Sequence, residues 1–144
     1  MVDARDSKSR DGNIVPVRVR PLVPVSSKIK KRISVQDCIF CKIISKEISS
    51  KIILENEQIL VLQDIAPKAP IHFLIIPKKH IRDLSSCDER DSFILSDILM
   101  MAQQLSKETP CSQSFKLLMN NGHSAGQRVF HLHFHFLAGK VFSE

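Results

Sequence analysis

The stretch GQRVFHLHFHFLAGK, residues 126–140, carries three histidines at alternate positions. Strict alternation with Phe, Val and Leu predicts a β-strand, on which His131, His133 and His135 share one face at a spacing of roughly 6.6 Å. The apolar residues of the other face are expected in a core: Phe130, Leu132, Phe134 and Phe136. A row of solvated histidines is the plain alternative. Three imidazoles crowded on one rigid face instead favour a use, either in nucleophilic and acid–base chemistry or in binding a metal.

The loop NNGHSAGQ, residues 120–127, leads directly into this strand. Gly122 and Gly126 allow main-chain conformations that other residues avoid, and they allow a ligand to approach the backbone closely. Backbone N–H groups in such a loop can surround a phosphate, and Gln127 and Arg128 add side-chain donors. Glycine-rich loops often only turn the chain. Here the position next to the histidines favours a phosphate site.

Outward from this region, hydrophobic periodicity predicts the remaining elements. The expected helices lie near residues 37–48 and 88–106, and the expected strands lie near residues 51–55, 58–63, 71–77, 114–120 and 130–137. The longer helix has a capping box in Ser85 with Asp88 or in Ser86 with Glu89. Its expected buried stripe is Ile94, Ile98, Met101 and Leu105. Five strands, two helices and hairpin-like connections predict an α+β fold with a five-stranded, mainly antiparallel sheet.

Charge divides the 144 residues into two regions. Residues 1–34 hold nine Lys and Arg against three Asp, which accounts for the whole net charge of +6. This basic segment has three prolines and little periodicity, so we expect a disordered extension ahead of one domain over residues 35–144. It lacks aromatic residues for base stacking, so nucleic-acid binding is not expected. No membrane span or secretory signal is visible. A cytoplasmic location is therefore expected, with a mitochondrial one as the alternative if the extension is a targeting segment.

Cys38 and Cys41 stand at a spacing that suits a zinc site. The spacing alone leaves metal binding, redox chemistry and simple packing open. The other two cysteines, Cys87 and Cys111, have no partners at useful spacing.

Several motifs in the same order resemble the histidine-triad (HIT) superfamily, and within it the histidine triad nucleotide-binding proteins. HLHFHFL at residues 131–137 matches the alternating histidine signature. QDIAPKAPIHFLIIPKKHI at residues 63–81, IFCKIISKEI at 39–48 and NNGHSAGQRVFH at 120–131 match as well. The resemblance covers roughly residues 37–140. It implies the HIT-like fold and hydrolysis at the α-phosphate of purine nucleotide conjugates, such as those of AMP or GMP, through a nucleotidyl-histidine.

By position, the resemblance implies that His133 is the nucleophile, that His135 assists the leaving group and that His131 supports the site. It implies that Asp64 accepts hydrogen bonds from the ribose hydroxyls. It also implies an apolar base pocket of Phe40, Ile43, Leu62 and Ile65, and a phosphate site of Asn120, Gly126, Gln127 and Arg128. A small hydroxyl residue is usual where this chain has Arg128. His72 matches the family too, but no role is assigned to it.

The resemblance further implies a structural zinc ion held by Cys38, Cys41, His80 and His131, no organic cofactor and a homodimer. A purine nucleoside phosphoramidase is the first functional hypothesis, and dinucleoside polyphosphate hydrolysis is a variant of it. A non-catalytic nucleotide-sensing or interaction protein and a zinc-binding interaction module are the alternatives from other classes.

Overall fold

A computed structural model describes residues 35–143 of the chain. The expectation of a disordered extension over residues 1–34 lies outside these residues. These residues form two α-helices, α2 (Ile39–Ile44) and α3 (Ser92–Glu108), and five strands. The strands are β1 (Ile52–Glu55), β2 (Ile59–Gln63), β3 (Ile71–Pro77), β4 (Phe115–Leu118) and β5 (Phe134–Ala138). No helix in the described part of the chain is both long and apolar enough to cross a membrane.

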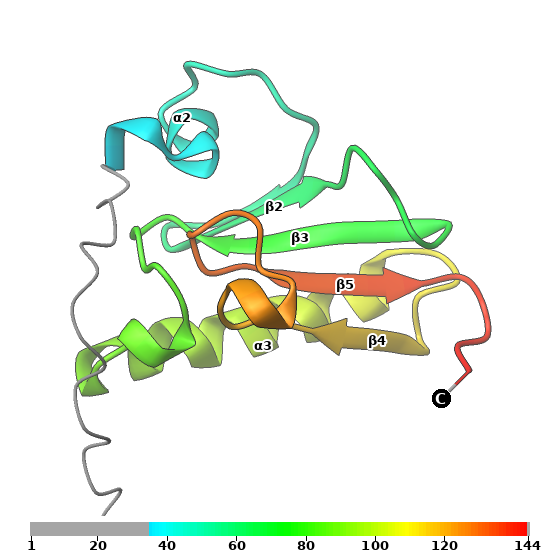
Figure 1. Ribbon diagram of the computed structural model, residues 1–144. Helices are drawn as coiled ribbons and strands as arrows, with labels where there is room; N and C mark the ends of the chain where they lie inside the picture. Colours follow the sequence, from blue (N-terminus) through cyan, green and yellow to red (C-terminus); the bar gives the residue numbers. More distant parts are fainter. Residues whose placement is uncertain (1–34, 144) are drawn as a thin grey trace, which may run out of the picture. The chain divides into compact units, whose positions relative to one another are not determined.

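The five strands form one sheet in the order β1-β2-β3-β5-β4, and every neighbouring pair is antiparallel (Figure 1). The predicted α+β fold is therefore confirmed. β3 and β5 lie side by side at the centre, with Leu74 opposite His135 and His72 opposite Leu137. This register brings two histidines from strands that are distant in the sequence onto neighbouring positions of one sheet face.

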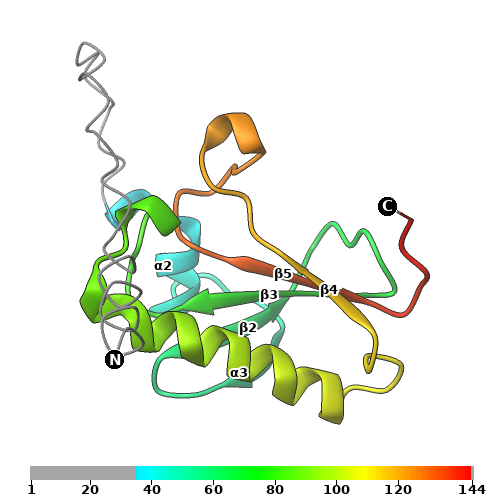
Figure 2. The same cartoon turned by 90° about the horizontal axis from the view of Figure 1, so that it is seen from below.

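Side chains alternate between two apolar clusters, one on each face of the sheet. Ile59, Val61 and Ile75 point to the face that α3 covers, in the larger cluster. Leu60, Leu62 and Ile76 point to the face that α2 covers, in the smaller one. Figure 2 shows the long helix α3 crossing the strands on its side of the sheet. Because α2 has only six residues, it leaves part of its face to polar side chains.

Helix α3 buries the predicted stripe of Ile94, Ile98, Met101 and Leu105 against the sheet. The predicted capping boxes were wrong by a few residues. The observed box joins Asp88 with Asp91 at a short 3-10 helix, η3 (Glu89–Asp91), that precedes α3. Asp91 also accepts from Lys79, so the start of the helix is tied to the segment after β3.

Strand β5 is shorter than the alternation of its sequence predicts, because it begins only at Phe134. Its ladder with β3 ends at Ile75 paired with Phe134. Beyond this pair, Pro77 has no N–H with which to continue the hydrogen bonds between the two strands. Its carbonyl oxygen instead accepts from the ring of His131 at 2.7 Å. His131 and His133 therefore lie before the strand rather than along it, and both are buried. The expectation that all three histidines lie along one strand is therefore wrong, because only His135 lies on β5.

Candidate functional site

Four histidine rings lie along the sheet face that α2 covers. His72 comes from β3, His135 from β5, and His131 and His133 from the segment that enters β5. The rings of His133 and His135 are 5.1 Å apart, and those of His72 and His135 are 5.2 Å apart. Phe40 of α2 packs edge-on against both His131 and His133. The predicted triad is thus brought together, with a fourth histidine beside it.

His133 has a single tautomer that its surroundings favour. Its Nδ1 lies 2.7 Å from the carbonyl oxygen of His131, which can only accept, so Nδ1 carries the proton and donates. The lone pair is then on Nε2. Burial lowers the pKa of His133 below the ordinary histidine value of 6.5, which favours the neutral form of the ring. A neutral imidazole with a free Nε2 is a nucleophile.

His72, to which the sequence assigned no role, determines the tautomer of His135. The backbone N–H of Lys68 donates to Nδ1 of His72 at 3.0 Å, so the proton of a neutral His72 is on Nε2. That Nε2 lies 2.9 Å from Nδ1 of His135 and 3.2 Å from Oδ2 of Asp64. Nδ1 of His135 accepts, which leaves its own proton on Nε2. His135 is therefore arranged to present an N–H group, the complement of His133.

The sequence did not indicate a role for His72, because its partner is a main-chain amide in the loop IAPKAP. A contact with a main-chain amide leaves no pattern of residue types in the sequence. The sequence signal that could have indicated it is that Asp64 and His72 lie on either side of the short, proline-containing loop IAPKAP. Asp64 is itself oriented, because its Oδ1 accepts from the backbone N–H of Ala66 at 2.8 Å.

Burial favours the uncharged forms of His135 and His72. Burial first, and then the adjacent rings of His133 and His72, lower the pKa of His135 to about 4. Burial also lowers the pKa of His72, although the Asp64 carboxylate acts in the opposite direction. An anionic group bound beside these rings would favour their protonated forms and raise their pKa values. The acid is thus formed where a phosphate arrives rather than in the free protein.

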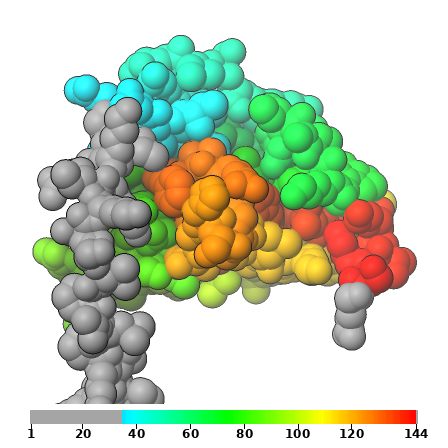
Figure 3. Space-filling model, viewed as in Figure 1, coloured from blue at the N-terminus to red at the C-terminus, as the bar shows by residue number. Residues whose placement is uncertain are grey.

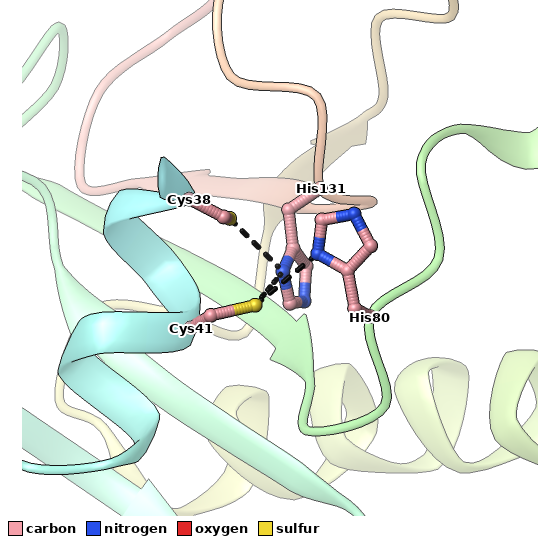
Figure 4. A group of neighbouring side chains, drawn as sticks. All are labelled: Cys38, Cys41, His80 and His131. Carbon is pink, nitrogen blue, oxygen red and sulfur yellow. Dashed lines mark hydrogen bonds between the residues drawn. The ribbon is translucent and has the colours of Figure 1, made fainter. Parts of the chain in front are cut away.

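A second cluster lies at the other end of the row, and Figure 4 shows its four side chains pointing toward one another. Cys38 and Cys41 of the first turn of α2 both lie 3.5 Å from Nδ1 of His131, and Cys41 lies 3.2 Å from Nδ1 of His80. All four ligand atoms lie within 4.8 Å of one another. A tetrahedral ion with ~2.3 Å bonds to sulfur and ~2.0 Å bonds to nitrogen needs donors roughly 3.3–3.8 Å apart. These four side chains can therefore hold a metal ion.

The tautomer of His131 also suits a metal ligand. Its Nε2 lies 2.7 Å from the carbonyl oxygen of Pro77 and donates to it, so the lone pair is on Nδ1, the atom that faces the cysteines. Burial lowers the pKa of His131 to about 4, which keeps the ring neutral. Burial and the neighbouring Cys38 raise the pKa of Cys41 to about 11, so a bound cation would have to displace thiol protons.

Asp64, His72 and His135 also bring three potential ligand atoms together. Here the tautomers do not fit. Because the Lys68 amide donates to Nδ1 of His72, the proton on Nε2 occupies the position that a metal would need. The contact between the Lys68 amide and His72 therefore distinguishes this cluster from the cluster that contains Cys38 and Cys41. The cluster with the cysteines suits a metal, whereas this cluster suits proton transfer.

The glycine loop is held from within by the residues expected to bind phosphate. The side chain of Gln127 is buried, accepts from the N–H of Gly122 at 2.7 Å, and donates to the carbonyls of Arg82 and Val129. The expectation that this side chain is a phosphate donor is therefore wrong, because its polar atoms are already engaged. Asn120 similarly donates to the carbonyl of Ala125 at 2.7 Å.

Gly122 and Gly126 have φ values of 89° and 93°, a region that residues with a Cβ rarely adopt, so the loop requires glycine at both positions. In Figure 3 the orange surface of this loop lies between the cyan surface of α2 and the green surface of the segment leading into β3. Arg128 is exposed at the end of the loop. It lines a pocket of about 180 Å³ together with Asp37, Cys38, Ile39, Val129 and Phe130.

The residues expected to form the base pocket do not all lie together. Phe40 and Leu62 are buried in the cluster beneath α2, and Ile43 packs against that cluster. Ile65 is 97% exposed and lies outside it. Phe130, expected in the core, is half-buried beneath the guanidinium of Arg82 at 5.1 Å.

Comparison with known proteins gives consistent matches. The HIT domain model matches residues 45–141. An uncharacterised HIT-like protein of Synechocystis is 41% identical over 108 residues, which cover 75% of this chain and 95% of that protein. The crystal structure of a HIT family hydrolase from Legionella pneumophila has a TM-score of 0.71 at 39% identity, over 74% of this chain and 96% of that one. The histidine triad nucleotide-binding protein from Candida albicans has a TM-score of 0.63 at 35% identity, over 74% and 84%.

Proposed function

Because this chain belongs to the HIT family, we propose that it is a hydrolase that cleaves purine nucleotide conjugates at the α-phosphate, with phosphoramidates of AMP or GMP as the substrate class. The observation that carries the proposal is the pair of opposite tautomers: a free Nε2 lone pair on His133 and an Nε2–H on His135, on rings 5.1 Å apart. The names of the Legionella hydrolase and the Candida nucleotide-binding protein support the class.

In the proposed reaction, Nε2 of His133 attacks the α-phosphorus of the substrate. The bound phosphate favours the protonated form of His135, and as the P–N bond breaks the leaving amine takes a proton from Nε2 of that ring, which returns to its neutral form. Water then attacks the nucleotidyl-histidine, gives a proton to His135 and releases the mononucleotide, which restores both rings. His72 is a positioning residue in this scheme, because it holds Nδ1 of His135 and delivers the ring in one orientation.

The nucleotide-binding roles follow the family resemblance where the structure leaves room for them. Oδ1 of Asp64 accepts from the N–H of Ala66, and Oδ2 lies 3.2 Å from Nε2 of His72 and 4.0 Å from Nδ1 of His135. Because each carboxylate oxygen has two lone pairs, the carboxylate is proposed to accept from the ribose hydroxyls as well. Phe40, Ile43 and Leu62 are proposed to support the base from α2 and β2. Gly126 and the main chain at Gln127 and Arg128 are proposed to approach the phosphate, with Asn120 and the Gln127 side chain acting as braces.

The metal cluster is proposed to hold zinc, which two sulfur and two nitrogen donors suit. Zinc would be structural in this position, because all four coordination positions come from protein side chains. It would fix α2 against the segment that carries His131, two residues before the proposed nucleophile. The folded part of the chain is also proposed to form a homodimer.

Steady-state hydrolysis of an adenosine phosphoramidate by the full chain tests the proposed function. We expect turnover with release of AMP and free amine in equal amounts. Rapid denaturation at alkaline pH during turnover preserves the acid-labile P–N bond, and mass spectrometry should then find AMP covalently attached to the peptide that contains His133. Tight AMP binding without turnover of any conjugate would instead support the nucleotide-sensing alternative.

A further inference from the structure

Asn121 and Gly122 form the only Asn–Gly sequence in the 144 residues of the chain. Asparagine is among the chemically labile residues of proteins. The main-chain nitrogen of the next residue can attack the side-chain amide and close a cyclic imide, and glycine permits this approach because it has no Cβ. Both residues are partly exposed, so water reaches them. The reactive pair therefore lies in the glycine loop that precedes the histidines.

The side-chain amide of Asn121 is held by Ser85. Its Oδ1 accepts from the backbone N–H of Ser85 at 3.2 Å, and its Nδ2 donates to Oγ of Ser85 at 2.9 Å. Ser85 is an exposed residue of a short 3-10 helix, η2 (Leu84–Ser86). Hydrogen bonds between such surface segments open locally while the rest of the fold stays intact. The clamp therefore restrains the amide but does not immobilise it permanently.

The attacking atom, the main-chain nitrogen of Gly122, is restrained separately. Its N–H donates to Oε1 of the buried Gln127 at 2.7 Å. Nε2 of Gln127 donates to the carbonyl oxygens of Arg82 and Val129, so the position of this acceptor is fixed. The nitrogen attacks only when it gives up its proton, which means that this hydrogen bond must be lost. One contact thus holds the amide and another holds its attacker.

We propose that Asn121–Gly122 is a modification site, at which spontaneous loss of ammonia is limited by the opening of these contacts with Ser85 and Gln127. In the first step a bond forms between the nitrogen of Gly122 and Cγ of Asn121, and the bond from Cγ to Nδ2 breaks. Nδ2 departs as ammonia with the proton of the Gly122 N–H. Water then opens the imide at either of its carbonyl groups, which gives aspartate or isoaspartate at position 121.

The two products differ in what they do to the loop. A carboxylate of aspartate can still accept from the N–H of Ser85, and the Ser85 hydroxyl can donate to it, so the clamp is kept. Isoaspartate adds a methylene group to the main chain and moves the N–H of Gly122 away from Gln127. Under the proposed function this loop approaches a phosphate, so the altered main chain and the added negative charge should weaken nucleotide binding. This consequence rests on the proposed function, whereas the modification itself does not.

The test follows conversion at Asn121 in the full chain, kept in mildly alkaline buffer, by mass spectrometry of the peptide that contains this residue. A free peptide with the sequence of residues 117–126 gives the unrestrained rate. The wild-type chain should convert at least about tenfold more slowly, since more than one hydrogen bond must open. Ser85→Ala removes the acceptor of Nδ2 and should raise the rate by about 2- to 10-fold, as expected for one hydrogen bond.

Two matched variants isolate the hydroxyl of Ser85. Ser85→Thr keeps a hydroxyl and should stay near the wild-type rate. Ser86→Ala removes a neighbouring hydroxyl that bonds to Asp83 instead, and should leave the rate unchanged. Conversion of the wild type as fast as the free peptide, or equal rates for the wild type and Ser85→Ala, would overturn the proposed control by these contacts. No conversion in either protein, while the peptide converts, would overturn the site itself.

Nucleotide affinity tests the consequence for the loop. The isoaspartyl form, separated from the unconverted chain by ion exchange, should bind AMP more weakly. Equal affinity of the two forms would overturn the link between this modification and nucleotide binding. The conversion rates remain a test of the modification site even if the chain hydrolyses no nucleotide conjugate, so failure of the proposed function is distinguishable from failure of this inference.

Discussion

His133 is the residue on which the proposed chemistry depends most directly. Substitution His133→Ala removes the Nε2 lone pair that is proposed to attack the substrate, while Leu132 and Phe136 keep their places in the core. We expect turnover of a phosphoramidate to fall by far more than about a hundredfold, with the fold and AMP binding largely retained. Rates of hydrolysis and the AMP dissociation constant check this. A variant that keeps more than about a hundredth of the wild-type rate would refute the covalent role.

His135 makes the stability of the protein depend on pH. Its pKa is lowered from 6.5 to about 4 in the folded chain, so between these values the unfolded chain binds more protons. Stability is therefore complete above pH 6.5 and is lost as the pH falls toward 4. At pH 5 this one residue should cost on the order of 2 kcal/mol relative to pH 7.5.

The pH effect of His135 is measured by urea denaturation of the wild type and of His135→Gln at both pH values. The variant lacks the titrating ring, so its stability should fall less between pH 7.5 and pH 5. An equal fall in both proteins would show that other groups carry the acid sensitivity.

At the scale of single residues, the sequence predicted the triad and the metal cluster but not the function of His72. The alternating histidines and the CxxC spacing are patterns of side chains, whereas the family resemblance supplied His80 and His131 as the other two metal ligands. The structure brings both groups together. The roles of His72 and of Gln127 depend on contacts with main-chain atoms. Such contacts follow from how loops fold onto each other, which residue identity does not encode locally.

At the scale of elements, we expect α2 to be held by the side chains at its start more than by its own length. A six-residue helix without a side-chain cap has little intrinsic stability, and its first residues are fixed by Cys38, Cys41 and packing of Phe40. Zinc held by these cysteines would join α2 to His80 and His131. Removal of the metal should therefore loosen this helix before it affects the sheet.

Purified protein that has not been treated with chelators should contain about one zinc ion per chain. Cys41→Ser should lower the zinc content to near zero and lower the melting temperature, whereas Cys111→Ser, an exposed cysteine outside the cluster, should change neither. Metal analysis and thermal melting in the presence and absence of a chelator provide the measurements. Zinc-free protein whose melting does not respond to added zinc would remove the metal from the proposed function.

The elements themselves were largely predictable, and the exceptions have identifiable causes. Period-two and helical patterns located β3 and the buried stripe of α3. The same alternation predicted too long a β5, because it carries no information about Pro77 on the neighbouring strand, near which the ladder ends. Strand length is set by the partner, whereas the alternation only describes the strand itself.

At the scale of the whole molecule, the apolar stripe of α3 gives no reason for dimerisation, since the sheet already buries it. The remaining reasons are different. Phe93 and Met100 are more than half exposed and lie seven residues apart on the outer face of α3, and β4 is an open edge of the sheet. A self-complementary surface that covers both is a common solution for such features.

We expect light scattering at micromolar concentration to give a mass of about 33 kDa, twice the 16.3 kDa of one chain. Met100→Lys should shift the mass toward one chain, because a charge on that face opposes burial, while Gln104→Lys, a polar residue on the same exposed side, should have a smaller effect. A stable wild-type monomer with full phosphoramidase activity would show that neither surface needs a partner.

One feature of the site bears on how such a protein changes over generations. The tautomers of His131, His133 and His72 are each set by a main-chain group: the carbonyls of Pro77 and His131 and the amide of Lys68. Point mutations replace side chains and leave these groups in place. Side-chain substitutions in the segments around Pro77 and Lys68 therefore need not change the positions of the protons, as long as the main chain keeps its course. Proline is the one residue that position 68 should not tolerate, because proline has no N–H to donate to His72.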